Sequence, residues 1–227
     1  RLSGGENDFI NGSSPAAGMV DYATIIKPGE AIGTFWGYEW TGLDEKGHDT
    51  YTDVDGNQMI DGGDRKVIGK ANPDFTLGWN NSLSYKNWDL SMQFTSQLGF
   101  KILNEPRAYY ENNSHAYNRL KSVEEAPYGG QYTLSSSQPQ TMVSYYLENG
   151  NFLKLTNLTI GYNFPFKNNK YIKNVRAYLS GDNLFCITGY SGLDPELSNP
   201  YPTYAGIDNR DKYPSIRSFT FGLNLTF

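Results

Sequence analysis

The sequence predicts an all-β protein built from antiparallel strands, each with one apolar and one polar face. Aromatic residues make up 15% of the 227 residues, and 24 glycines and 11 prolines accompany them. This composition favours strands and turns over helices. Long segments alternate polar and apolar residues with a period of two, which places successive side chains on opposite faces of a strand. No segment approaches the roughly 18 consecutive apolar residues that indicate a transmembrane helix.

The predicted strands are joined alternately by short turns and long segments. The strands are expected at 19–26, 31–43, 74–85, 88–95, 152–164, 175–188 and 218–227. Short turns follow the first, third and fifth of them, whereas long segments fill 44–72, 101–150 and 189–214. In outer-membrane β-barrels short turns lie on the periplasmic side and long loops lie outside. The last strand shows the pattern best, because five apolar side chains from Phe219 to Phe227 share one face.

Two architectures would produce such strands: a soluble β-sandwich and a transmembrane β-barrel. The barrel is favoured because the long segments fall at one end of the strands. Tryptophan and tyrosine also gather near the predicted strand ends, as in an interfacial aromatic girdle. These residues are Trp36, Trp40, Tyr85, Trp88 and Tyr162. About seven strands cannot close a barrel, whose smallest common form has about eight. The sequence therefore predicts an antiparallel transmembrane β-barrel segment, completed by strands that this chain lacks.

Charge and motif content argue against several functional classes. The net charge is −5 and no block of Lys or Arg occurs, so nucleic acid is not an expected partner. Neither a catalytic triad, a metal-hydrolase motif nor a phosphate-binding loop is found, and the chain is not expected to be an enzyme. The single cysteine, Cys186, is interpreted as a small buried or wall residue. The first residues have no apolar core, so no signal peptide is expected there.

An acidic segment carries the strongest chemical signal. Oxygen-bearing side chains stand at positions 1, 3, 5, 9 and 12 of a twelve-residue stretch that begins at Asp53 and ends at Asp64. This is the ligand spacing of an EF-hand-type calcium loop, in which position 7 supplies a backbone carbonyl. Four carboxylates in so short a stretch would repel one another without a cation. The sequence therefore predicts a structural calcium site formed by Asp53, Asp55, Asn57, Met59, Asp61 and Asp64.

This segment departs from the EF-hand pattern at two positions. Gln58 stands where that pattern has glycine, and Asp64 is shorter than the usual bidentate glutamate. No flanking helices are predicted, so calcium sensing by helix opening is not expected. Ile60 at position 8 is expected to pack into the protein and anchor the loop. An acidic turn without metal and a catalytic carboxylate pair are the alternatives, although no general acid or base partner can be assigned to such a pair.

Several motifs follow one another along nearly the whole chain. They are GEAIGTFWGY at 29–38, the acidic segment ending DRKVIG at 64–69, NPDF at 72–75, SYKNWDL at 84–90, NFLKLTNLTIGY at 151–162, VRAYLSGDNLF at 175–185, YSGLDPE at 190–196 and YPSIRSF at 213–219. Their content and order resemble the C-terminal part of the SusC/RagA group of TonB-linked outer-membrane transporters of Bacteroidetes. The terminal Phe227 resembles the aromatic ending of outer-membrane barrels.

The resemblance implies nutrient import across the outer membrane. Residues 1–227 would be the C-terminal part of a barrel of about 22 strands, with extracellular loops at 44–72, 101–150 and 189–214. The plug domain and the segment that contacts the TonB complex would belong to an N-terminal part outside this chain. Implied partners are a SusD-like surface lipoprotein, the TonB complex, outer-membrane lipid and an oligosaccharide or peptide substrate. No substrate-binding residue can be assigned. The alternative is a calcium-stabilised soluble β-sandwich, acting as an adhesin or glycan-binding module.

Overall fold

The chain forms two compact units in the computed structural model, which describes residues 10–12, 22–46, 49–111, 118–124, 142–165, 171–197 and 204–227. The sheet unit comprises Asp74–Leu98, Asn151–Gly189 and Tyr213–Phe227. The loop unit comprises Arg1–Pro73, Gly99–Gly150 and Tyr190–Lys212. Among the described residues, no helix is both long and apolar enough to cross a membrane.

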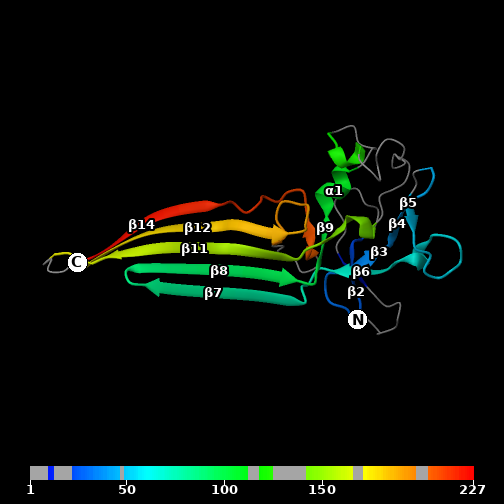
Figure 1. The fold of residues 1–227 in the computed structure, drawn as a ribbon. Coiled ribbons are helices and arrows are strands. Elements are labelled where there is room, and N and C mark those ends of the chain that lie inside the picture. Colours follow the sequence, from blue (N-terminus) through cyan, green and yellow to red (C-terminus); the bar gives the residue numbers. More distant parts are fainter. Residues whose placement is uncertain are drawn as a thin grey trace. The chain divides into compact units, whose positions relative to one another are not determined.

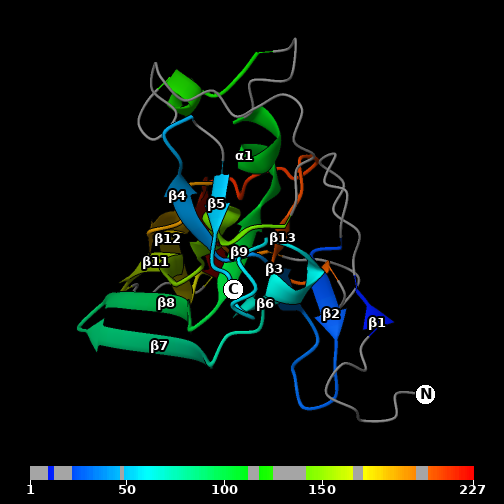
Figure 2. The same ribbon diagram turned by 90° about the vertical axis from the view of Figure 1, so that its right-hand side faces the viewer.

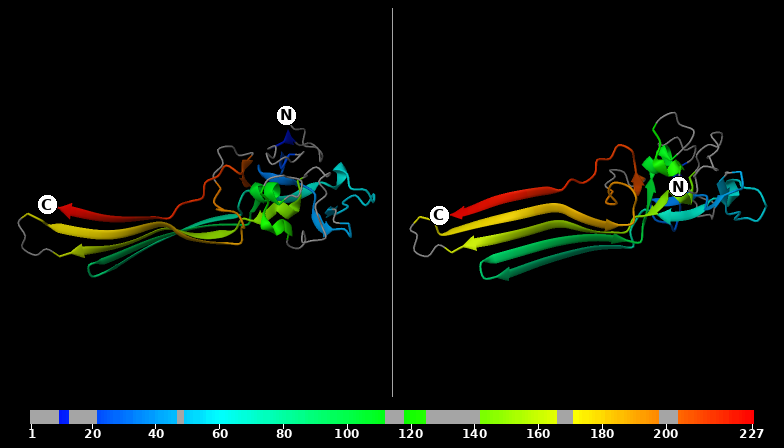
Figure 3. Two further views of the ribbon diagram at one scale, coloured as in Figure 1. Left: turned by 90° about the horizontal axis from the view of Figure 1, so that it is seen from above. Right: turned by 45° about the horizontal axis from the view of Figure 1, so that its top comes forward.

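The sheet unit is one antiparallel five-stranded sheet, in the order β14-β12-β11-β8-β7. Figures 1 and 3 show the five strands side by side, from the red β14 to the blue-green β7. Their bounds are β7 Phe75–Tyr85, β8 Trp88–Leu98, β11 Phe152–Phe164, β12 Asn174–Thr188 and β14 Ser218–Thr226. The tight hairpin between β7 and β8 turns at Lys86, which has a positive φ of 55°. The five segments predicted to form long strands from residue 74 onward are therefore confirmed.

The register of these strands collects their apolar residues on one face. Leu83 pairs with Leu90, Leu90 with Ile160, Ile160 with Leu179, and Leu179 with Phe221, so one apolar row crosses all five strands. Four of these five side chains are exposed, with 42% of Ile160 and 69% of Phe221 accessible to solvent, and Leu90 is half-buried. A second row near the other end of the strands includes Phe94, whose ring stacks on Trp79 at 5.1 Å.

The opposite face of the same sheet is polar and hydrogen-bonded. Asn157 donates to Asp182 at 2.7 Å and to Ser180 at 3.0 Å, next to the bulge that interrupts the pairing of β11 with β12. Ser218 donates to the second carboxylate oxygen of Asp182 at 2.8 Å. One sheet with an exposed apolar face and an organised polar face fits a membrane barrel wall, whose two faces meet lipid and an aqueous lumen.

The loop unit consists of short strands and turns. It contains a four-stranded sheet (β1-β2-β3-β6), a three-stranded sheet (β10-β9-β13) and the hairpin β4-β5, which Figure 2 shows together with α1. The strands are β1 Ile10–Asn11, β2 Thr24–Ile26, β3 Thr34–Gly37, β4 Trp40–Leu43, β5 Asp49–Tyr51, β6 Lys66–Lys70, β9 Lys101–Asn104, β10 Leu147–Asn149 and β13 Ile207–Asp208. The helices are α1 Glu105–Tyr110 and the single turns η1 Gly62–Asp64, η2 Lys121–Glu124 and η3 Ser144–Tyr146.

A buried core joins the small sheets of the loop unit. Phe35 of β3 and Leu103 of β9 are fully buried, and Ile207 of β13 lies in the same cluster. Met142 and Tyr146, far along the chain from β3, complete this core. The long segments 44–72 and 101–150 are therefore not structureless within their described residues, because they contribute strands and helices to a packed unit.

Two predicted strands differ from the structure. The described part of segment 19–26 forms only β2, and segment 31–43 divides into β3 and β4. Strands β2 and β3 belong to the four-stranded sheet of the loop unit, and β4 belongs to its hairpin. The break follows from close approach of the backbone: a side chain at Gly37 would lie 2.2 Å from the carbonyl oxygen of Met142. Gly42, with a positive φ of 135°, lies at a register shift within β4 and makes that strand irregular. The long sheet thus has five strands, two fewer than the sequence pattern suggests.

Candidate functional site

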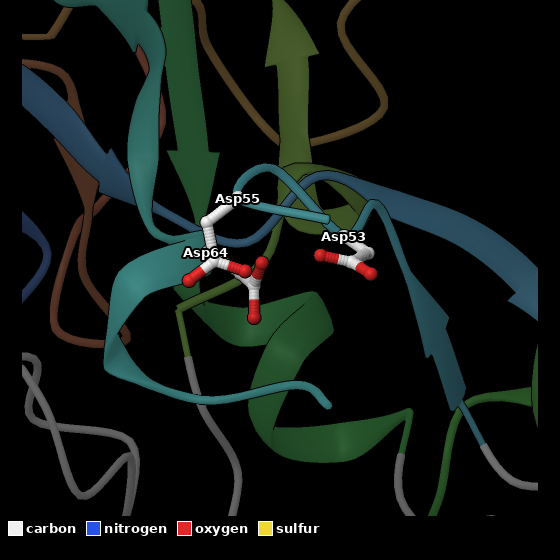
Figure 4. Close-up of side chains that lie close together, drawn as sticks. All are labelled: Asp53, Asp55 and Asp64. Carbon is white, nitrogen blue, oxygen red and sulfur yellow. The ribbon is translucent and has the colours of Figure 1, made fainter. Parts of the chain in front are cut away.

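The acidic loop, residues 53–64, brings together three of the predicted calcium ligands. Carboxylate oxygens of Asp53, Asp55 and Asp64 all lie within 4.8 Å of one another. Figure 4 shows these side chains converging from the beginning and the end of the loop. The loop lies between β5 and β6, so its two ends are held by strands of the loop unit. Like-charged oxygens at such separations repel one another, and a bound cation would remove this cost.

Local hydrogen bonds fold the first half of the acidic loop. Asp53 accepts from the backbone N–H groups of Gly56 at 2.7 Å and Gln58 at 2.9 Å. Asp55 accepts from the backbone and the side-chain amide of Asn57, both at 3.0 Å. These are the tight turns that Asp and Asn side chains form with the backbone a few residues downstream. An ionised carboxylate offers about four acceptor sites, so these bonds leave capacity for a cation.

The second half of the loop is fixed by reciprocal capping of η1. Asp61 accepts from the N–H of Gly63 at 2.6 Å, and Asp64 accepts from the N–H of Asp61 at 2.8 Å. The other oxygen of Asp64 accepts from the N–H of Val54 at 2.7 Å and so closes the loop. Backbone donors at Asp61 and Val54 hold the pKa of the fully buried Asp64 below its ordinary value. Asp64 is therefore poised to remain a carboxylate.

At Gln58, where the sequence departs from the EF-hand pattern, the backbone geometry still follows that pattern. Gln58 has a φ of 65°, in the left-handed region that explains the usual glycine at this place. The expectation for Ile60 is wrong, because 46% of this residue is exposed instead of packed into the protein. The reason is the turn at η1, where Asp64 takes the buried position that closes the loop. Asp61 caps η1 and does not join the group formed by Asp53, Asp55 and Asp64.

The structure also describes the remaining predicted ligands, Asn57 and Met59. The side-chain oxygen of Asn57 accepts from the N–H of Met59 at 2.7 Å, which orients the chain at position 7. The side chain of Met59 is 65% exposed, consistent with a contribution through its backbone only. The loop can therefore present a compact set of hard oxygen atoms, the ligand type that Ca²⁺ prefers.

A second feature, the α1 pocket, lies elsewhere in the loop unit. It is a cavity of about 580 Å³, with Pro106, Arg107, Tyr110, Leu120 and Leu193 in its wall. Asn104 starts α1 as its N-cap, because its side-chain oxygen accepts from the N–H of Arg107 at 3.0 Å. The pocket is thus built at the beginning of a short helix and under the segment that follows β12.

A buried ionic network supports the α1 pocket. Arg107 donates to Glu111 at 2.5 Å, to Glu148 at 3.2 Å and to the hydroxyl of Tyr145 at 2.6 Å. Its guanidinium also stacks over the Tyr145 ring, 4.5 Å from the centroid. Each charge is matched by hydrogen bonds, which is the condition for burying ionised groups without a large penalty.

Glu148 joins three separate segments in this network. It accepts from the backbone N–H and the hydroxyl of Ser191, both at 2.7 Å, and from Asn104 at 3.0 Å. Burial alone would raise the pKa of Glu148, but the donors Ser191, Asn104 and Arg107 outweigh it and hold the pKa below its ordinary value. Sequence reasoning missed these residues. Only the Asn104-Glu105-Pro106 start signal of α1 could have been recognised, since Pro is tolerated in a first helical turn.

Curated relatives of this chain are TonB-dependent receptors. TonB-dependent receptor P3 of Formosa agariphila is 34% identical over all of this chain and 25% of its own length. TonB-dependent receptor SusC of Bacteroides thetaiotaomicron is 31% identical over all of this chain and 23% of its own length. The chain thus spans about a quarter of the length of the curated relatives it matches. No protein-family model matches it.

Solved structures agree with this result. The RagAB peptide importer in its closed-closed state matches with a TM-score of 0.74 and 25% identity, over 96% of this chain and 25% of that one. The open-open state matches with a TM-score of 0.73 and 24% identity, over 90% and 23% of the two chains. The fold is therefore that of a transmembrane β-barrel segment and not of a soluble sandwich. The chain belongs to the SusC/RagA group of TonB-dependent receptors, which are outer-membrane proteins.

Proposed function

We propose that this chain forms part of the barrel of an importer that takes up glycans or peptides together with a SusD-like lipoprotein. The observation that carries this proposal is the five-stranded sheet, whose apolar row of Leu90, Ile160 and Leu179 would face lipid. The polar face would then line the lumen through which a hydrophilic nutrient passes. The solved relative RagAB is described as a peptide importer, which supports the peptide class. The glycan class and the lipoprotein partner rest on the resemblance to the SusC/RagA group.

Growth on defined nutrients tests this function. The receptor that contains this chain would be deleted from its host, and growth would be followed on a peptide digest and on mixed oligosaccharides as limiting nutrients. The expected result is a defect on one class, restored by the wild-type receptor expressed in trans. Purification of the tagged receptor in detergent should also bring down a surface lipoprotein. Equal growth of both strains on every nutrient, with no lipoprotein recovered, would contradict the proposal.

We further propose that the acidic loop binds one Ca²⁺ ion with a structural role. Support comes from the EF-hand ligand spacing, the convergence of Asp53, Asp55 and Asp64, and the left-handed backbone at Gln58. The ion would pin a loop whose tip exposes Val54, Met59 and Ile60. Limited proteolysis of the full-length receptor with calcium or with EDTA tests the assignment, and unchanged cleavage within residues 53–64 would refute it.

A further inference from the structure

The α1 pocket is suited to a ligand that is mostly apolar. Its volume of about 580 Å³ lies within the range of roughly 300–1,000 Å³ that is usual for small-molecule sites. Carbon-rich surfaces of Pro106, Tyr110, Leu120 and Leu193 form much of its wall. Leu193 is 72% exposed at the edge of the pocket, and Tyr110 and Leu120 are also exposed. Exposed apolar side chains gathered around one cavity indicate a binding surface.

From this lining we propose that the α1 pocket receives an apolar side chain of a peptide substrate. The inference rests on the proposed import function and selects peptides from its two substrate classes. It concerns residues that neither the sequence pattern nor the names of the relatives assign to a ligand.

The polar groups of the pocket are largely used within the protein. Asn104 directs its amide to Glu148 and Ser191, and its oxygen caps α1. The hydroxyl of Ser191 accepts from Asn104 and donates to Glu148 at 2.7 Å. A sugar carries several hydroxyl groups on each ring, and each one that loses water without gaining a partner costs free energy. An apolar side chain makes no such demand, so this lining favours it over a glycan.

Some donor capacity remains for a peptide backbone. The hydrogen bonds of Arg107 described above use three of the five N–H groups of a guanidinium. Ser122 also lines the pocket. A peptide carbonyl oxygen is an acceptor for these donors. The carboxylates of Glu111 and Glu148 beside Arg107 outnumber its single positive charge, so a free ligand carboxylate is disfavoured here.

The pocket is also held in shape before any ligand arrives. Glu148 ties the segment after β12 to α1 through Ser191 and Arg107, and Leu120 donates its N–H to the carbonyl of Tyr110 at 3.0 Å. A preformed site avoids the entropy cost of ordering loops upon binding. This favours capture of a flexible peptide, which itself loses conformational freedom.

Photo-crosslinking to the full-length receptor in detergent tests the proposal. The probe is a Gly-Gly-X-Gly-Gly peptide in which X is p-benzoylphenylalanine, and the labelled residues are mapped by mass spectrometry. We expect labels within residues 104–110, 118–122 or 191–193, reduced by an excess of Gly-Gly-Phe-Gly-Gly but not by Gly-Gly-Ser-Gly-Gly or maltotriose. Leu193→Asp should reduce labelling about tenfold, because it places a charge beside the apolar site.

A matched control separates the pocket from general effects of an added charge. Ile32 is an exposed aliphatic residue of the loop unit outside the pocket wall, so Ile32→Asp should label like the wild type. Labelling that persists in Leu193→Asp, or that maltotriose removes, would overturn the inference. Uptake of peptides by cells is measured separately. Its absence would count against the import function, whereas loss of labelling specific to Leu193→Asp would still support the pocket.

Discussion

The carboxylate of Asp89 and the guanidinium of Arg176 meet across Gly161 on the polar face of the sheet unit. The two side chains form hydrogen bonds of 3.0 and 2.5 Å, although they come from β8 and β12, the two neighbours of β11. A methyl group at position 161 would lie about 2.5 Å from both side chains. The missing side chain of Gly161 therefore makes this cross-strand ion pair possible.

Gly161→Ala is expected to lower the stability of the barrel by about 1 kcal/mol, the upper end of the range for partly exposed ion pairs. The added methyl group would push Asp89 and Arg176 apart. Gly78→Ala is the matched control, because it adds the same group on β7 where no atom lies within 4 Å. Thermal unfolding of the purified receptor, followed by its loss of compact migration in detergent gels, measures both variants. Equal unfolding temperatures would show that the ion pair contributes nothing.

The long strands could be predicted from the sequence because their environment imposes a simple pattern. Apolar and polar residues mostly alternate along β11 and β12, and a register shift between Leu155 and Asn157 disturbs this alternation. Segment 31–43 carries a similar alternation but packs differently. Thr34 and Phe35 are both buried, one polar and one apolar, because β3 is covered on both sides within the loop unit. Alternation alone cannot distinguish a half-exposed strand from an enclosed one.

The acidic loop could be predicted from the sequence, whereas the network around the α1 pocket could not. Asp53, Asp55 and Asp64 lie within one loop, so their spacing already predicts that they converge. The α1 network is different, because Arg107 and Glu148 are 41 residues apart and Ser191 is 43 residues further on. Arg107 and Glu148 meet because β9, which leads into α1, pairs with β10. Ser191 joins them through its own hydrogen bonds to Glu148. Such contacts follow from strand pairing that local patterns do not encode.

A charge on the apolar face of the sheet should be far more harmful than one on its polar face. We expect Leu90→Arg to destabilise the barrel by about 2–4 kcal/mol if its position lies near the bilayer midplane. Ser91→Arg, the next residue on β8, points to the other face and should cost about 1 kcal/mol or less. The amount of receptor assembled in the outer membrane provides the measurement. Similar losses for both variants would contradict the assignment of the two faces.

Removing one carboxylate from the acidic loop should weaken calcium binding. Asp55→Asn is expected to reduce the affinity for Ca²⁺ on the order of tenfold, because affinity follows the number of charged ligands. Glu30→Gln removes the same charge from an exposed turn outside the loop and should leave affinity unchanged. Calorimetric titration of the full-length receptor compares the variants. Equal affinities of Asp55→Asn and the wild type would place the ion elsewhere or exclude it.

Acid should release the segment that follows β12 from α1. The pKa of Glu148 is lowered by its donors in the folded state, so its contribution is complete above the pKa of about 4.3 that glutamate has when unfolded. The contribution is lost as the pH falls through the lower folded pKa. Hydrogen exchange at the Ser191 amide, which donates to Glu148, should therefore stay protected from neutral pH to about pH 5 and lose protection below about pH 4.

Glu148→Gln makes this test specific. The amide keeps the size of the side chain but removes the charge that Arg107, Asn104 and Ser191 share, so protection at Ser191 should be low at every pH. The loss in local stability is expected to be about 1.5–3 kcal/mol, the range for hydrogen bonds to a charged group, because Arg107 keeps Glu111 as a carboxylate partner. Glu30→Gln again serves as the control for a lost charge at an exposed site. A wild-type profile in Glu148→Gln would show that other contacts hold the segment, since a charge-independent tie would not respond to this substitution.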